Sequence, residues 1–181
     1  DRAGRIYVAN AGANTITVYA AAAAGNVAPT SVISGTATRL AKPVSVAVDG
    51  AGALFVANQT GNSVTEYAPG ASGNAPPTLM ITTGIATPSA VSITSGDDVV
   101  VANTNPSDFT LYSAPRGLIA GTVTPAGITT PGGVSLYSSG SLMATGTASG
   151  NVGIFGPALI VTAVGSVGHC VPSPYQDPAP R

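Results

Sequence analysis

The side chains best suited to nucleophilic chemistry are His169 and Cys170, the one histidine and the one cysteine of the sequence. A cysteine nucleophile needs a base within hydrogen-bond reach. Adjacent residues of an extended strand point to opposite faces, so this pair does not readily form a dyad. A single cysteine also allows no internal disulfide, which leaves a thiol linked to a partner or lipid, or an incidental side chain, as alternatives. We predict no catalytic residue.

Carboxylates could bind a cation, and Asp97 and Asp98 are the one adjacent pair among the seven acidic residues. A calcium site needs six or more oxygen ligands, and no further carboxylate lies near this pair in the sequence. We therefore predict that the pair caps a turn. The sequence also has no P-loop, dinucleotide-binding fingerprint or nucleophile elbow. The prediction is a chain without metal or cofactor.

Three asparagines, Asn10, Asn58 and Asn103, recur 48 and 45 residues apart and could line a polar ring for a ligand. Each ends a similar apolar phrase, at residues 6–10, 54–58 and 99–103, and a worn fourth copy spans 141–145. We favour a structural role, in which each side chain caps the turn between the second and third strands. Asn58-Gln59-Thr60 matches a glycosylation sequon, which we interpret as fortuitous because Asn58 occupies a repeat position.

Three further phrases repeat with the first, and each is strand-like. The second alternates polar and apolar residues and closes on an aromatic, at 15–19, 63–67, 109–112 and 151–155. The third lies at 31–34, 79–82, 121–124 and 158–162, and the fourth at 44–48, 91–94 and 134–137. Alternation with a period of two, in β-branched and aromatic residues, indicates strands with two different faces. Gly- and Asp-containing turns at 49–52, 95–98 and 138–141 join the units.

Four short strands in each unit of about 40–50 residues is the spacing of propeller blades. The predicted fold class is all-β, a β-propeller of four-stranded antiparallel blades with just under four blades present, about fifteen strands and almost no helix. The blades would span about 1–43, 44–90, 91–132 and 133–165, followed by a Pro-rich tail at 166–181. The alanine run 20–24 is too short to nucleate a helix alone, so we expect a loop or strand extension.

Two sets of side chains should be buried between neighbouring blades, because they recur once in each unit. The first set is Val8, Val56, Val101 and Met143, and the second is Tyr19, Tyr67, Tyr112 and Phe155. We interpret the aromatic set as packing residues and not as a platform for stacking a sugar or a base.

The phrases Leu-Phe-Val-Ala-Asn, Asn-Ser-Val-Thr-Glu-Tyr and Val-Ser-Val-Ala-Val-Asp, within residues 44–67, resemble those of NHL-type and YncE-like bacterial β-propellers. The resemblance covers about residues 1–165 and is strongest over 1–103. It implies that the phrase at 44–49 is the innermost strand of a blade and the phrase at 54–58 the second. Some enzymes among these relatives carry metal-binding acids or histidines at the channel mouth, a pattern that this chain does not match.

The turn at residues 1–5 aligns with the turn at 49–53, so the sequence begins just after the place of an innermost strand. We therefore expect an incomplete propeller: a fragment, a processed chain or part of a longer protein. A blade without its neighbour exposes strand edges that invite pairing. We expect a protein partner or a second copy to cover them.

Charged residues are 7% of the sequence and the net charge is −1, against about 25% charged residues in a typical domain. Binding to nucleic acid or to an anionic membrane needs clustered Lys and Arg, so we expect neither. The stretch 151–171 has the length of a membrane span, but it contains strand phrases and glycines, and we expect no direct membrane span. The composition favours an extracytoplasmic location, periplasmic or at the cell surface, with a signal peptide outside this chain.

These observations predict a non-catalytic, extracytoplasmic propeller that acts as a protein–protein binding or scaffold module, with a place as a subunit of a larger assembly as one option. The alternative is a propeller enzyme of the lyase or lactonase type whose active-site residues lie mostly outside this chain. A carbohydrate-binding propeller is disfavoured because aromatics are 5% of the residues and tryptophan is missing.

Overall fold

The computed structural model describes residues 1–113, 118–124, 128–136, 142–146 and 152–155. These residues form four antiparallel sheets whose strands pair in chain order. The first sheet contains β1 (Ile6–Asn10), β2 (Thr15–Tyr19) and β3 (Ser31–Ile33), and the second β4 (Pro43–Val48), β5 (Leu54–Asn58), β6 (Ser63–Tyr67) and β7 (Leu79–Ile81). The third contains β8 (Pro88–Ile93), β9 (Val99–Thr104), β10 (Ser107–Ser113) and β11 (Leu118–Val123), and the fourth β12 (Pro131–Leu136), β13 (Leu142–Gly146) and β14 (Val152–Phe155).

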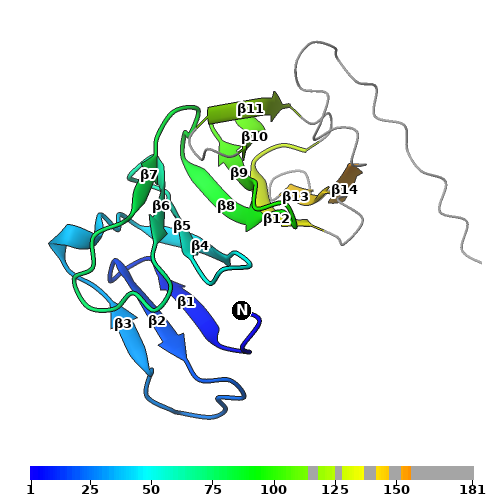
Figure 1. Ribbon diagram of the computed structural model, residues 1–181. Coiled ribbons are helices and arrows are strands. Elements are labelled where there is room, and N and C mark those ends of the chain that lie inside the picture. The colour runs from blue at the N-terminus through cyan, green and yellow to red at the C-terminus, as the bar shows by residue number, and fades with distance from the viewer. Residues whose placement is uncertain (114–117, 125–127, 137–141, 147–151, 156–181) are drawn as a thin grey trace, which may run out of the picture.

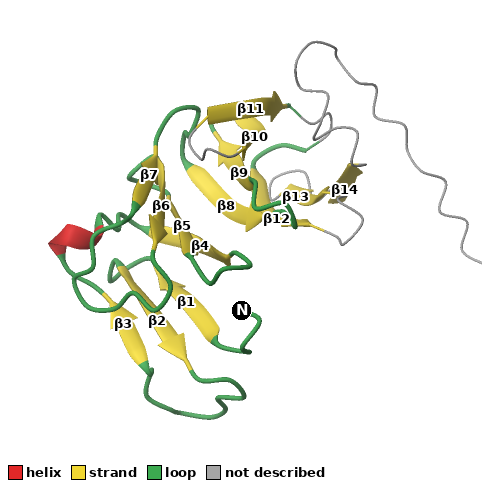
Figure 2. Ribbon diagram, in the orientation of Figure 1, coloured by secondary structure: helices red, strands yellow, loops and turns green. Residues whose placement is uncertain are grey.

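The described strands number fourteen, and the one helical segment among the described residues is a single 3-10 turn, η1 (Thr36–Thr38). This confirms the all-β prediction, as Figure 2 shows at a glance. The alanine run 20–24 forms a turn and loop, as expected. The expected strand at 158–162 lies outside the described residues.

The four sheets follow one another around an arc in Figure 1, from β1–β3 in blue to β12–β14 in yellow and brown. Strands β4, β8 and β12 lie along the inside of this arc, and β3, β7 and β11 lie toward its outside. No described strand lies on the inner side of β1, the place that β4, β8 and β12 occupy in the other sheets. The phrase at 44–48 therefore lies in the innermost strand of its sheet.

The second and third sheets each bury two apolar faces, one against each neighbour in the arc. We call the face toward the preceding sheet the rear face and the face toward the following sheet the forward face. In the second sheet, Leu54, Val56 and Tyr67 form the rear face and pack with Ile16 and Ile33 of the first sheet. Its forward face, which includes Phe55, Ala57 and Val64, packs with side chains of the third sheet such as Val99, Val101 and Tyr112.

The recurring aromatic residues occupy one register position. Tyr19, Tyr67, Tyr112 and Phe155 pair across the sheet with Ile6, Leu54, Val99 and Leu142, respectively. Tyr67 and Tyr112 are fully buried, which confirms their packing role. The Tyr67 hydroxyl donates to the carbonyl of Thr38 and the Tyr112 hydroxyl to that of Thr83. Each tyrosine thus links the rear face of its own sheet to the connector that leaves the preceding sheet. Burial raises the pKa of both phenols.

The prediction of burial is wrong for Val8 and Tyr19, which lie in the first sheet of the arc. Val8 is 39% exposed and Tyr19 is half-buried, although their counterparts Val56, Val101, Tyr67 and Tyr112 are fully buried. The physical reason is that both lie on the rear face of the first sheet, which has no preceding sheet to cover it within the described residues.

The prediction that Met143 is the buried counterpart of Val56 is wrong for a different reason. The fourth repeat is shifted by one residue relative to the alignment of the sequence phrases. Val134 pairs with Ala144 as Val46 pairs with Val56, so the counterpart of Val56 is Ala144. A slip of one residue turns every side chain of a strand to the other face. Ala144 is fully buried and Met143 is half-buried on the forward face. The side chain of Phe155 is outside the described set.

We predict that Tyr67→Ala lowers the free energy of unfolding by about 3–5 kcal/mol, because it empties a fully buried site and removes a hydrogen bond. Tyr19→Ala is the matched control on the uncovered rear face and should cost clearly less. Chemical denaturation followed by far-UV circular dichroism measures both. Equal losses for the two variants would show that the rear-face assignment is incorrect.

Candidate functional site

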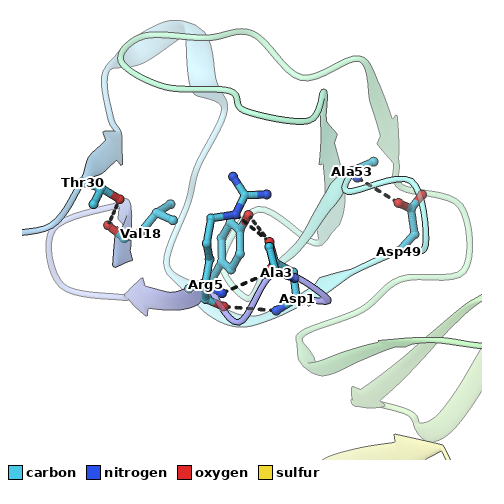
Figure 3. Close-up of polar contacts among 8 residues, drawn as sticks. Asp1, Ala3, Arg5, Val18, Thr30, Asp49 and Ala53 are labelled. Carbon is cyan, nitrogen blue, oxygen red and sulfur yellow. Dashed lines mark hydrogen bonds and ion pairs between the residues drawn. The ribbon is translucent and has the colours of Figure 1, made fainter. Parts of the chain in front are cut away.

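In the first three sheets, the turn that follows the innermost-strand position is capped by one side chain. Asp49 Oδ1 accepts hydrogen bonds from the amides of Ala51 at 2.9 Å and Ala53 at 2.8 Å. Asp1 Oδ1 accepts the corresponding bonds from Ala3 at 3.0 Å and Arg5 at 2.9 Å. Figure 3 shows both turns, together with the Asp1–Arg5 ion pair of 2.7 Å. The turn at the start of the sequence is therefore built like one that follows an innermost strand.

In the third sheet, this capping role falls to Thr94 and not to the predicted acidic pair. Its hydroxyl accepts from the amides of Gly96 at 3.2 Å and Asp98 at 3.0 Å. Asp97 is exposed, with a left-handed backbone at φ 64. Within the described residues no group of three His, Cys, Asp or Glu side chains could hold a metal ion.

The side chains of Asn58 and Asn103 are buried, and each binds a backbone amide of the connector that enters its sheet. The prediction that they cap the turn after their own strand is therefore wrong in the partner that it named. Asn58 Oδ1 accepts from the amide of Ala41 at 3.1 Å, and its Nδ2 donates to Thr65 Oγ1 at 3.0 Å. Asn103 Oδ1 likewise accepts from the amide of Ala86 at 3.1 Å. Ala41 and Ala86 lie in the connectors that enter the second and third sheets. Each asparagine thus ties the incoming connector to the second strand of its blade, which is a structural role.

Asn10 makes only half of this arrangement. Its Nδ2 donates to Thr15 Oγ1 at 3.2 Å and Thr17 Oγ1 at 3.3 Å. Its Oδ1, the atom that receives a connector amide in the other two copies, accepts no hydrogen bond from the described residues. The position that holds an incoming connector is therefore present in the first sheet, and no described amide binds to it.

A second hydrogen bond between neighbouring blades was missed by the sequence analysis. Its acceptor is the side chain four residues after each repeated asparagine. Asn14 Oδ1 accepts from the amide of Lys42 at 2.6 Å, and Asn62 Oδ1 from that of Thr87 at 2.7 Å. Ser107 Oγ accepts from the amide of Thr130 at 3.2 Å. The three amides belong to residues with a left-handed backbone, each followed by the proline that opens an innermost strand. The proline that recurs at the start of these strands was the sequence signal that could have indicated this contact.

The asparagine of the glycosylation sequon is fully buried in this network. Asn58 has its amide group engaged within the fold, so the sequon is not accessible in the folded chain. His169 and Cys170 lie outside the described residues. None of the described residues belongs to a helix with the length and hydropathy that a membrane crossing requires.

Asp108 has a buried carboxyl group next to Asn103. It accepts a hydrogen bond from Asn103 Nδ2 at 2.7 Å. Burial raises the pKa of Asp108 above its ordinary value, and the bond from Asn103 offsets part of this rise. The corresponding residues in the first two sheets are Thr15 and Ser63, which carry no charge. Among the described residues, Asn103 is therefore the one repeated asparagine that contacts a titratable side chain at this position.

An open hollow of about 320 Å³ lies where the capped turns of the first three sheets meet. Its lining combines the guanidinium of Arg2 with the carboxylates of Asp1, Asp49 and Asp97. The Asp1 and Asp49 carboxylates are engaged as turn caps. This leaves the hollow with mixed charge and no convergent set of free groups on which a reaction could be built.

The strongest departures from the repeat lie at the two ends of the described arc. On the rear face of the first sheet, Ile6 is 45% and Val8 39% exposed, whereas Leu54 and Val56 are at most 3% exposed. On the forward face of the fourth sheet, Val152 is 63% exposed, and its register counterparts Ile16, Val64 and Phe109 are buried. Both ends therefore present apolar side chains at positions that are covered wherever a neighbouring sheet is present.

The comparisons with known proteins place the chain by its fold. No family model matches it, and no curated protein matches its sequence. It is similar to the WD40 β-propeller domain of Doa1, with a TM-score of 0.66 and 14% identity over 85% of this chain and 47% of that one. It is also similar to streptogramin B lyase, with a TM-score of 0.58 and 11% identity over 86% of this chain and 52% of that one.

A functionally unknown protein from Desulfotomaculum acetoxidans gives a TM-score of 0.61 and 14% identity, over 83% of this chain and 46% of that one. The chain thus spans about half the length of the solved structures it matches. Together with the four radial sheets, these likenesses show that the described residues are blades of a β-propeller.

We predict that Asn58→Ala lowers the free energy of unfolding by about 2–3 kcal/mol, because the amide of Ala41 and the hydroxyl of Thr65 lose a buried partner. Asn10→Ala is the matched control, since no connector amide depends on it, and it should cost less. Urea titration of both variants measures the difference. If the two costs are equal, the connector bond contributes nothing to stability.

Asp108 predicts a dependence of stability on pH. Its pKa is raised in the folded chain, so the folded state holds the proton more tightly than the unfolded state, and this contribution is lost as pH rises through the raised pKa. Asp108→Asn removes the titration. We expect wild type to lose stability relative to this variant as pH rises above about 4, the ordinary pKa of an aspartate. Parallel curves of unfolding free energy against pH would contradict this.

Proposed function

We propose that the chain is a non-catalytic binding or scaffold module whose contact surfaces are the two end faces of its arc. The observation that carries this proposal is the exposure of Ile6, Val8 and Val152 at positions buried in the other sheets. Burying apolar surface stabilises a complex by roughly 25 cal/mol per Å². A net charge of −1 favours contacts of apolar and backbone groups over steering by charge. The likeness to a WD40 propeller domain is compatible with such a role.

The NHL-type and YncE-like repeat and an extracytoplasmic location are part of the same proposal. Support for the repeat type comes from the phrase Val-Ser-Val-Ala-Val, which lies in the innermost strand β4 with Leu-Phe-Val-Ala-Asn beside it in β5. Support for the location comes from a sequence poor in charge and rich in small and hydroxyl residues. Propellers serve many functions, so these features set a context for binding and name no ligand.

The test is the state of association of the purified chain. We expect light scattering at micromolar concentration to show association, because a second copy can cover an end face when another partner is missing. Val8→Lys places a charge on the rear face and should shift the chain toward monomer. Val27→Lys is the matched control, because Val27 is similarly exposed, at 43%, but lies in a linker outside the sheets.

A stable, cooperatively melting monomer at micromolar concentration would count against the proposal, as would a Val27→Lys effect as large as that of Val8→Lys.

A further inference from the structure

The outer edge of β3 is covered by a segment that belongs to the following sheet. The amide of Gly73 donates to the carbonyl of Val32 at 2.7 Å, and the carbonyl of Gly73 accepts from the amide of Ser34 at 2.8 Å. Gly73 lies in the linker 68–78 between β6 and β7, and its pairing with β3 is parallel. In Figure 1 this linker leaves β6, reaches β3 and returns to β7. One residue of the linker thus pairs with β3 through both of its backbone groups.

Strand β7 has the place of β3 in the second sheet, and its outer edge carries the same backbone groups. The register puts Ile81 at the position of Ile33. The groups that correspond to those bound by Gly73 are therefore the carbonyl of Met80 and the amide of Thr82. No described residue forms a hydrogen bond with either group, and β6 is the one described strand that pairs with β7. Both outer strands have three residues, so the length of β7 allows the same pairing.

The two edges differ because the neighbouring linkers differ in length. Residues 20–30 and 68–78 join the second and third strands of the first sheet and the corresponding strands β6 and β7 of the second. In the third sheet, residues 114–117 join β10 to β11 between the paired Ser113 and Leu118. A connection that short can close a hairpin, but it cannot also run along the edge of the preceding sheet. The contrast lies between the second and third sheets, in the middle of the sequence.

Exposed apolar side chains lie on both sides of the β7 edge. Met80 is 49% exposed on the rear face of the second sheet, where it pairs with Thr65. On the forward side, Ile119 of β11 is 42% exposed and lies beside the connector that leaves β7, since a Cβ added at Gly84 would be 2.8 Å from Ile119 Cδ1. Strand β7 also has no charged residue and no proline, which commonly protect an open edge. A strand added here would gain apolar contacts as well as backbone bonds.

We propose that the outer edge of β7 binds an extended segment of a partner protein, which lies parallel to the strand as residues 72–74 lie to β3. One residue of this segment donates to the carbonyl of Met80 and accepts from the amide of Thr82. In the bound linker that residue is Gly73, whose left-handed backbone at φ 63 favours glycine. The residue before it lies beside Met80, so its side chain is apolar. The partner segment is thus an apolar residue followed by glycine in an extended chain.

The bound linker also shows which of its features the new site needs. Backbone bonds to an open sheet edge supply affinity in this mode of recognition, and alternate side chains supply specificity. In the linker 68–78, Asn74 Oδ1 also accepts from the amide of Ala37 at 2.8 Å. The connector after β7, residues 82–87, is shorter than the connector after β3, residues 34–42, and it lacks the 3-10 turn that contains Ala37. An asparagine after the glycine is therefore not required at β7.

This site is separate from the end faces of the proposed function, and the inference goes beyond that function. It concerns a rim strand between two neighbouring sheets, whereas the end faces belong to the first and fourth sheets. Val8→Lys, which tests an end face, should leave binding at β7 unchanged. A loss of peptide binding in that variant would place the peptide on the end face and overturn this inference.

The experiment adds to the full chain a fluorescent peptide with the sequence of residues 69–76 and the change Ser72→Leu. We expect saturable binding by fluorescence anisotropy, together with protection of the Thr82 amide in hydrogen exchange followed by NMR. Met80→Lys should weaken binding about tenfold, because a charge replaces the apolar contact beside the segment. Val27→Lys is the matched control at a similarly exposed residue, 43% exposed and far from β7 in sequence, and should bind as wild type does. Thermal melts verify that both variants are folded.

Two N-methylated peptides provide a second control. Methylation at the position of Gly73 removes the donor that meets the Met80 carbonyl and should abolish binding. Methylation one residue earlier alters an amide that faces away from β7 and should be tolerated. Equal tolerance of both peptides, an absence of binding, or protection of amides elsewhere than at Thr82 would overturn the proposal. Protection of the Thr82 amide in the chain without peptide would also overturn it, because the chain itself or a second copy would then occupy the edge.

Discussion

A sheet of three or four short strands has two apolar faces and can bury neither of them alone. Both faces of the second sheet are covered by its neighbours, with Leu54, Val56 and Tyr67 packed against the first sheet and Phe55, Ala57 and Val64 against the third. Stability therefore comes from contacts between neighbours, as in other repeat folds. This dependence explains why the same residue type is buried in the middle of the arc and exposed at its ends.

Stacking alone would leave the connectors between sheets with buried and unbonded backbone groups. The chain meets this need with side chains that recur in each repeat. Asn58 and Asn103 hold the incoming connector, and Asn14, Asn62 and Ser107 hold the residue that precedes the strand-opening proline. As a result, no buried side-chain nitrogen or oxygen among the described residues is without a hydrogen-bond partner. Two tyrosine hydroxyls complete the links between sheets. Polar groups thus set the register that the apolar faces require.

The functional surfaces proposed for this chain are the same repeat positions without their usual neighbour. Ile6 and Val8 have the chemistry of Leu54 and Val56, and Val152 has that of Val64, yet they are exposed. The outer edge of β7 has the backbone groups of β3 without the linker that covers β3. The binding proposed for these surfaces needs no special residue types, since the repeat buries the same positions elsewhere. By contrast, the charged hollow near Asp1 contains groups that already serve as turn caps.

The sequence by itself determined the all-β class, the strand phrases and the register position of the four aromatics, because alternation and repeat spacing are local properties. It placed the repeated asparagines in a structural role, but it assigned them to their own turns. Only the tertiary structure showed that they bind a connector 17 residues earlier in the chain. It also decided that Ala144 and not Met143 takes the buried place, since a slip of one residue is visible only in strand pairing. Exposure of Val8 likewise depends on which sheet lies beside it, and no local pattern records the neighbour of a strand.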